Sequence, residues 1–113
     1  MKPDDFMKLI DKIFADCKAL LVVKEMEYSE GVDRLDQFKK GIHFTGLPAH
    51  RVLAGMMLKH TTSIYDMLRD EDTTEYRMDK WEEKIYDHIN YLCLLMGILE
   101  DNQQAKKICV KDA

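Results

Sequence analysis

The chain has 113 residues, of which 46% are hydrophobic and 34% are charged, with a formal net charge of −4. This length supports one hydrophobic core, and the composition excludes disordered, collagen-like and low-complexity chains, which carry fewer apolar residues or far more than 5 glycines and 2 prolines. The net negative charge repels phosphate backbones and disfavours nucleic acid as a partner. We therefore expect a single domain over 1–113, in which residues 1–3 fray and residues 104–113 either fray or extend the third long helix.

The chain shows no feature of a membrane or secreted protein. No stretch approaches ~18 consecutive apolar residues, and the start of the chain lacks a basic segment followed by an apolar run. Cys17, Cys93 and Cys109 are far apart and lack the spacing of a zinc site or a disulfide framework. We expect a soluble cytoplasmic protein without a membrane partner, with Cys17 and Cys93 buried as small hydrophobic residues.

The first predicted helix spans residues 4–28. Its apolar residues recur every three or four positions, which is the period of a helix and not that of a strand. They are Phe6, Ile10, Ile13, Cys17, Leu20 and Leu21. Asp4 and Asp5 favour the positive end of the helix dipole, and Gly31 is the expected stop.

The middle of the chain predicts a short connector helix followed by a second long helix. In residues 32–47, Leu35 and Phe38 suit one short amphipathic helix, and glycines and Pro48 interrupt the pattern after it. Pro48 suits the first turn of a helix over 48–68. The apolar face of that helix consists of Leu53, Met56, Met57, His60, Ile64, Met67 and Leu68. Residues 69–74 then predict a solvated loop.

The third long helix has the clearest apolar pattern. It can begin at Thr74, Met78 or Asp79, and Asn102 marks its expected end. Its stripe consists of Trp81, Ile85, Ile89, Leu92, Leu95, Met96 and Leu99. After residue 91 other faces also become apolar, which predicts burial on two sides and therefore self-association as a dimer or higher oligomer. The fold class is all-α, a small bundle of three long helices and a short connector helix.

Polar residues interrupt the apolar faces of these helices. Glu83, Asp87 and Asn90 form one row that continues into Leu94 and Ile98, so they can border an interior cleft and hold a divalent metal ion, or they can form an ordinary solvated face.

The first two long helices carry similar polar intrusions. On the first, Lys24 falls on the apolar seam, with Glu27 and Tyr28 beyond it; they either meet a ligand or snorkel at the end of the bundle. On the second, His60 lies on the apolar face, with Lys59, Ser63 and Asp66 on its flank. A histidine in that position can equally be a hydrogen-bonded core residue.

Several common chemistries are excluded at the level of motifs. The sequence has no glycine-rich phosphate loop, no G-x-S-x-G and no H-E-x-x-H. Any phosphate must therefore be held by side chains such as Lys24, Arg34 and Lys59, or through a magnesium ion bound by carboxylates.

A set of short motifs resembles a known family. In chain order they are Lys24-Glu25-Met26-Glu27-Tyr28, Asp33-Arg34-Leu35, Phe38-Lys39, Leu58-Lys59-His60, Ser63-Ile64, Asp66-Met67, Glu83-Lys84-Ile85 and Asp87-His88-Ile89-Asn90-Tyr91-Leu92. Together they resemble the small phage and prophage proteins grouped as nucleotide-modification-associated domain one. The third-helix motif is also similar to that of all-α nucleoside triphosphate pyrophosphohydrolases of the MazG and dimeric dUTPase type, whose helix-borne carboxylates hold magnesium against a triphosphate.

These observations predict a phage-type protein of the bacterial cytoplasm that binds a nucleotide or a nucleotide-derived small molecule, and that sequesters a defence signal. The candidate ligand-binding residues are Lys24, Glu27, Tyr28, Asp33, Arg34, Lys59, His60, Ser63, Asn90 and Tyr91, and the candidate metal ligands are Glu83 and Asp87. One alternative is a magnesium-dependent pyrophosphohydrolase. Another is a helical module that inhibits a host protein.

Overall fold

The protein is all-α, as the periodicity predicts. The computed structural model describes the backbone of residues 1–28 and 33–112 and the side chains of residues 1–25 and 33–108. Its helices are α1 (Pro3–Tyr28), α2 (Asp36–Thr45), α3 (Ala49–Leu68) and α4 (Met78–Asp112), with a short 3-10 helix η1 (Thr73–Glu75) before α4. Within these ranges there is no strand, and no helix has the length and apolarity that crossing a bilayer requires.

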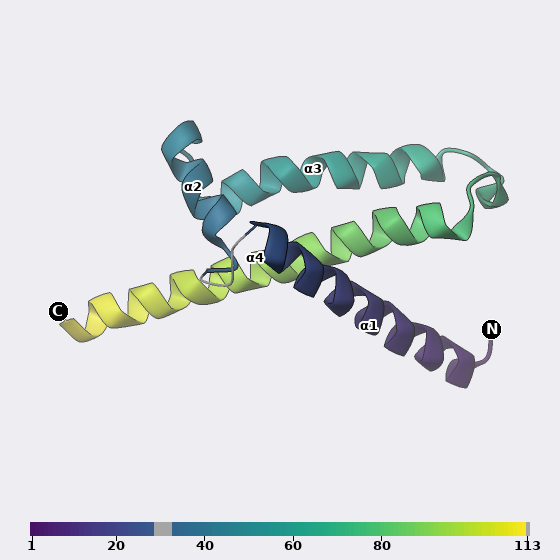
Figure 1. The fold of residues 1–113 in the computed structure, drawn as a ribbon, viewed down its shortest axis with the longest axis horizontal. Coiled ribbons are helices and arrows are strands. Elements are labelled where there is room, and N and C mark those ends of the chain that lie inside the picture. The colour runs from purple at the N-terminus through teal and green to yellow at the C-terminus, as the bar shows by residue number, and fades with distance from the viewer. Residues whose placement is uncertain (29–32, 113) are drawn as a thin grey trace.

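The long helices meet around the middle of α4. Figure 1 shows α3 and α4 lying side by side in opposite directions, with α1 crossing α4 and α2 standing at the start of α3. The N-terminal half of α1 and the C-terminal end of α4 both extend away from this centre (Figure 1). The molecule is consequently elongated, with extents of 56 × 32 × 26 Å.

The core lies where α2, α3 and α4 meet. Phe38 and Leu53 are fully buried there, surrounded by the buried side chains of Leu35, Val52, Leu94 and Ile98. The prediction that Leu35 and Phe38 anchor a short connector helix is confirmed. This core holds residues 33–37, here called the connector, against α4 and beside the end of α1.

The helix ends differ from the predictions at a few residues. Pro48 is the residue before α3 and not part of its first turn, and α2 ends at Thr45, followed by the C-cap Gly46 with a left-handed φ of 69°. Met78, one of the three predicted starts, begins α4, while Thr74 lies in η1. Helix α4 continues ten residues past Asn102, to Asp112, because nothing in that polar segment breaks a helix. Gly31 lies outside the described residues.

The buried face of α4 is not the one with the clearest apolar stripe. Trp81 is buried as predicted, but Ile85, Leu92, Met96 and Leu99 are exposed, and the buried positions further along α4 are Tyr86, Asn90, Leu94 and Ile98. The polar row therefore does run into the covered face. Burial of Cys17 is confirmed, whereas Cys93 is exposed, because α1 and α3 cover only one side of α4.

Candidate ligand-binding cleft

A cleft with two compartments opens between α1, the connector and α4. The small compartment, of about 210 Å³, is lined by Leu21, Lys24, Arg34, Gln37, Asp87, Asn90, Tyr91 and Leu94. The large compartment, of about 470 Å³, is lined by Lys18, Leu21, Val22, Glu25, Arg34, Leu35, Cys93, Leu94, Gly97, Glu100 and Asp101. Leu21, Arg34 and Leu94 line both, so the two compartments lie next to each other.

Asp87 is the electrostatic centre of the small compartment. Its Oδ1 accepts a hydrogen bond from the Lys24 ammonium at 3.3 Å, and its Oδ2 lies 3.7 Å from Nδ1 of His60. The carboxylate side chain is only 18% exposed, so a charge partner is needed to offset the cost of removing it from water. Lys24 supplies that partner from α1, and this bond ties α1 to α4.

His60 meets Asp87 as a neutral ring. Burial lowers its pKa below the ordinary value of 6.5; Asp87 opposes this shift, and the nearby Lys24, Lys84 and Lys59 add to it. His60 and Asp87 lie close together but therefore do not form an ion pair at pH 7. The imidazole also packs against the Tyr91 ring, with 4.9 Å between centroids, so that His60 supports the wall of the small compartment from behind.

Three polar atoms beside the cleft are buried without a partner. They are both amide atoms of Asn90, Nδ2 and Oδ1, and the Nη1 atom of Arg34, none of which has a hydrogen-bond partner among the described residues. Asn90 is 3% exposed. A buried polar atom left unpaired costs about 1–3 kcal/mol, so such atoms occur in folded proteins chiefly where water or a ligand completes them. The Asn90 amide offers two donors and an acceptor at one point.

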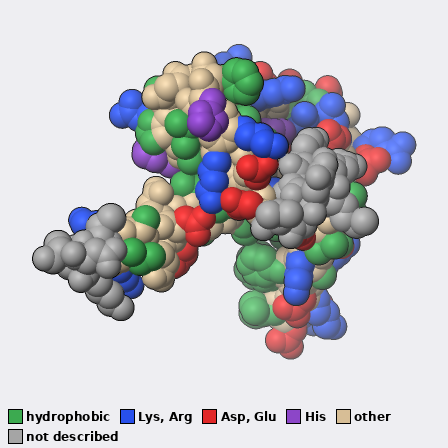
Figure 2. Space-filling view, turned by 60° about the vertical axis from the view of Figure 1, so that its left-hand side comes forward, with side chains coloured by type: hydrophobic (Ala, Val, Ile, Leu, Met, Phe, Trp, Pro, Cys, Tyr) green, Lys and Arg blue, Asp and Glu red, His purple; other side chains and the backbone are tan. Residues whose placement is uncertain are grey.

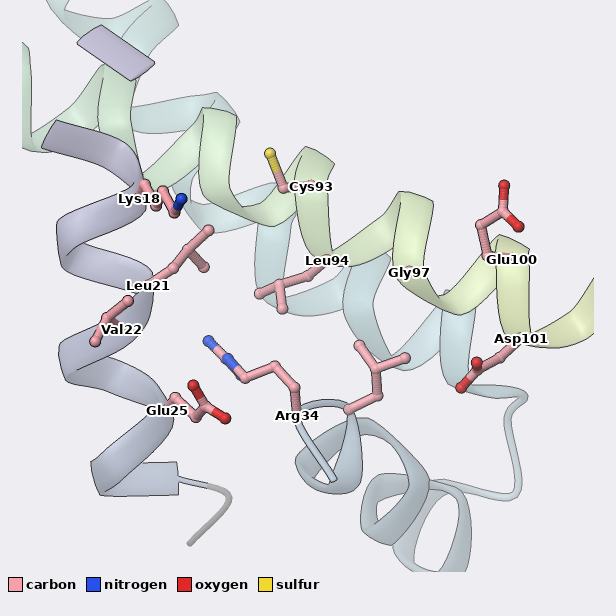
Figure 3. A pocket seen from close by; sticks show the side chains of 11 residues that line it. Lys18, Leu21, Val22, Glu25, Arg34, Cys93, Leu94, Gly97, Glu100 and Asp101 are labelled. Atoms are coloured by element: carbon pink, nitrogen blue, oxygen red, sulfur yellow. The ribbon is translucent and has the colours of Figure 1, made fainter. Parts of the chain in front are cut away.

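The large compartment is apolar inside and charged at its edges. Leu21, Val22 and Leu94 provide apolar walls, and Gly97 adds no side chain to the lining; a Cβ placed there would be in van der Waals contact with Leu35 at 3.5 Å. Figure 3 shows Arg34 extending from the connector across the cleft towards α1, with Glu25 beside it and Glu100 and Asp101 at the far end. Arg34 is thus a charged residue that lines both compartments.

Five of the predicted site residues meet in the small compartment: Lys24, Arg34, Asp87, Asn90 and Tyr91. His60 joins them through its contacts with Asp87 and Tyr91. These residues come from α1, the connector, α3 and α4, so side chains distant in the sequence do converge.

Other predicted site residues lie elsewhere. Lys59 and Glu83 are exposed, Ser63 is half-buried, and none of the three lines either compartment. Asp33 accepts hydrogen bonds from Lys39 Nζ at 2.6 Å and from the Leu35 backbone N–H at 3.0 Å, and these bonds lower the pKa of its carboxyl; it stabilises the start of α2. The side chains of Glu27 and Tyr28 lie outside the described residues.

The two predicted metal ligands are not arranged as a magnesium site. Glu83 is exposed outside the cleft and Asp87 is already paired with a lysine, whereas Mg²⁺ prefers several free oxygen ligands. Among the side chains at 1–25 and 33–108, no three of the His, Cys, Asp and Glu type gather as metal ligands. We therefore derive no chemical step through a metal ion.

The sequence missed the apolar half of the site. Val22, Leu35 and Gly97 line the large compartment, and so do Lys18 and Glu25, which lie three and four positions from Leu21 on the same side of α1. That spacing was a usable signal for Lys18 and Glu25. No sequence signal marks Gly97 as a lining residue, because the compartment exists only once Leu35 is packed against α4.

Comparison with known proteins identifies no relative that could guide the interpretation. No protein-family model, no curated protein and no solved structure matches the chain. The resemblance to nucleotide-associated phage proteins therefore stays a prediction.

Proposed function

We propose that the protein binds a nucleotide or a nucleotide-derived small molecule in the cleft between α1, the connector and α4. The observation that carries this proposal is the set of buried, unpartnered polar atoms of Asn90 and Arg34 beside an apolar compartment of about 470 Å³. Ligand pockets of about 300–1,000 Å³ with apolar walls and a few convergent polar groups are typical of small-molecule sites.

The charges of the site suit a phosphate at the small compartment. Lys24 and Arg34 contribute two positive charges against the single carboxylate of Asp87. The phosphate accepts hydrogen bonds from the Arg34 guanidinium, and Lys24 divides its donors between phosphate and Asp87. Figure 2 shows basic and acidic side chains lying next to one another at the centre of one face of the molecule, so the positive charge is local and the surface around it is mixed.

The remaining groups suit a base and a sugar. The Asn90 amide can pair with a base edge that presents a donor and an acceptor side by side, because it provides both. Leu21, Val22 and Leu94 cover the faces of a planar ring, and the carboxylates of Glu25 and Glu100 accept hydrogen bonds from sugar hydroxyls or exocyclic amines. Tyr91 lines the small compartment and supplies an aromatic surface there.

The proposal extends to the biological setting. The resemblance stated above supports a phage-type protein of the bacterial cytoplasm that holds a defence nucleotide and works as a homo-oligomer. In that role the protein releases its ligand unchanged. A magnesium-dependent hydrolase would instead return a cleaved ligand.

A ligand panel tests binding directly. We expect one class among ribonucleotides, deoxyribonucleotides and cyclic dinucleotides to raise the thermal midpoint of the full chain, since a ligand that binds only the native state stabilises it by mass action. Asn90→Leu and Arg34→Gln should each weaken the affinity at least about tenfold by calorimetry, one lost charge-assisted or buried hydrogen bond being worth about 1.4 kcal/mol or more. Arg51→Gln, at an exposed arginine of α3, is the matched control and should bind as the wild type does.

The same samples separate the alternatives. If no nucleotide shifts the midpoint and none is found by mass spectrometry in the native protein, the proposal is wrong and a protein-binding module is favoured. If a ligand binds, chromatography after incubation with and without magnesium distinguishes unchanged ligand from a hydrolysis product. Glu83→Gln and Asp87→Asn then show whether these carboxylates are needed for turnover.

A further inference from the structure

One face of α4 is apolar and mostly exposed. Its residues, here called the α4 stripe, are Ile85, Ile89, Leu92, Met96 and Leu99, of which Ile89 is half-buried and the other four are exposed. At 100° per residue they lie within a narrow sector, directly opposite the buried sector that contains Asn90, Leu94 and Ile98. Met96 is 59% exposed and Leu92 and Leu99 are each 43% exposed. The stripe is therefore not part of the core of a single chain.

The spacing of the α4 stripe is that of a helix-pairing seam. Its members alternate at intervals of four and three residues, which is the pattern of the inward-facing positions of a coiled coil. The seam extends over about 21 Å at a rise of about 1.5 Å per residue. Scattered single apolar residues on a surface need no partner, but five in one row indicate an interface.

The exposed area of the chain is that of a subunit and not of a monomer. A folded monomer of 13.3 kDa exposes about 6,450 Å² of surface, whereas this chain exposes 8747 Å². Its radius of gyration is 17.2 Å, against about 13 Å for a compact chain of this length. The excess of roughly 2,300 Å² exceeds the ~800 Å² per partner of a standard interface and falls in the range of obligate homodimers.

We infer that a second copy of this chain covers the α4 stripe in a two-fold symmetric interface. A two-fold contact brings the same patch of both subunits together, so a single self-complementary stripe is sufficient. The inference rests on the proposed homo-oligomer and is independent of the ligand. Cys93 and Gly97, which line the large compartment, directly follow Leu92 and Met96 in the sequence, so the second copy stands beside the cleft.

Sedimentation of the full chain tests this interface. The wild type should have twice the chain mass of 13.3 kDa at micromolar concentration, and Met96→Glu and Leu92→Glu should each sediment at 13.3 kDa. Met96→Leu should stay associated because it preserves the apolar contact. Leu58→Glu, at a position of α3 that is 61% exposed and outside the stripe, is the matched control and should also stay associated.

The outcomes distinguish failure of the stripe from failure of the oligomer. A wild type that sediments at 13.3 kDa overturns both. An associated wild type that is unaffected by Met96→Glu, or dissociated equally by Leu58→Glu, overturns the α4 stripe alone. A measurement on the wild type itself covers the case in which a variant does not fold: in a mixed-label sample the methyl groups of Ile85, Leu92 and Leu99 should show intermolecular nuclear Overhauser effects, and contacts confined to other helices would contradict the inference.

Discussion

At the scale of single residues, Asp87 is the central charge of the cleft. It lies between Lys24, with which it forms an ion pair, and His60, whose pKa is lowered by burial and partly restored by the Asp87 charge. The same carboxylate thus holds Lys24 at the cleft and partly offsets the effect of burial on the pKa of His60. Both effects depend on Asp87 being only partly accessible to water, since screening would weaken them at an open surface.

This arrangement predicts opposite shifts from two substitutions. A proton titration followed by NMR should place the pKa of His60 below 6.5; Asp87→Asn should lower it further and Lys24→Met should raise it, because the first removes an attractive charge and the second a repulsive one. An unfolded chain binds this proton near pH 6.5 and the native chain only at lower pH. The contribution of the neutral His60 to stability is therefore complete above pH 6.5 and is lost as the pH falls from 6.5 through the lower pKa of the native state. Equal pKa values in the wild type and both variants would contradict this account.

Helix α2 lies close to α3 at Gly41, which has no side chain. A Cβ on Gly41 would lie 2.5 Å from Cγ1 and 3.3 Å from Cγ2 of the buried Val52, whose branched side chain has little freedom to move. The two helices can approach closely only because residue 41 is glycine. This contact brings the connector, with Arg34 at its start, to the cleft.

Two alanine substitutions of helical glycines should therefore have opposite effects. Gly41→Ala should lower the free energy of unfolding by up to about 2 kcal/mol, since overpacking costs about 1–3 kcal/mol and the gain in helix propensity offsets about 1 kcal/mol of it. Gly55→Ala, with no atom within 4 Å of the new Cβ, should raise it by about 0.5–1 kcal/mol. Urea unfolding of both variants measures the difference. A Gly41→Ala protein as stable as Gly55→Ala would show that the helices are further apart in solution.

The whole molecule leaves much of its helix surface uncovered. The ends of α1 and α4 extend beyond the bundle (Figure 1), and Phe6 and Phe14 of α1 are more than half exposed. A chain of this shape has a small core of its own, so association should supply a large part of its stability.

The thermal midpoint should consequently depend on protein concentration. For a dimer that unfolds to separate chains, each tenfold increase in concentration adds about 1.4 kcal/mol of apparent stability, and the midpoint rises accordingly. Scanning calorimetry over a hundredfold range of concentration measures this slope. The slope should vanish in Met96→Glu, which removes the interface, and persist in Leu58→Glu. A midpoint of the wild type that does not change with concentration would mean that association contributes nothing to folding.

The sequence alone was sufficient to predict the long helices and one row of residues on α4 that borders the site. The 3.6-residue period of α1 and α3 predicted their extent to within a residue or two, and the row from Asp87 through Asn90 to Leu94 predicted that polar groups border a covered face. The position of Asp33 was less informative, because a carboxylate two residues before an N–H can serve a turn as well as a ligand. Lys59 lies on the flank of α3, as predicted, but it is exposed, and none of the described helices covers it.

What the sequence by itself determined is the secondary structure and the character of each helix face, because periodicity along one chain reports which side chains share a side. Which face is covered, and by which helix, was decided only by the tertiary structure. The packing of α1, α2 and α3 covers the sector of α4 with Asn90, Leu94 and Ile98 and leaves the more apolar sector with Leu92 and Met96 exposed. That choice depends on close packing among side chains far apart in the sequence, above all Phe38, Val52 and Leu53, and no local pattern encodes it.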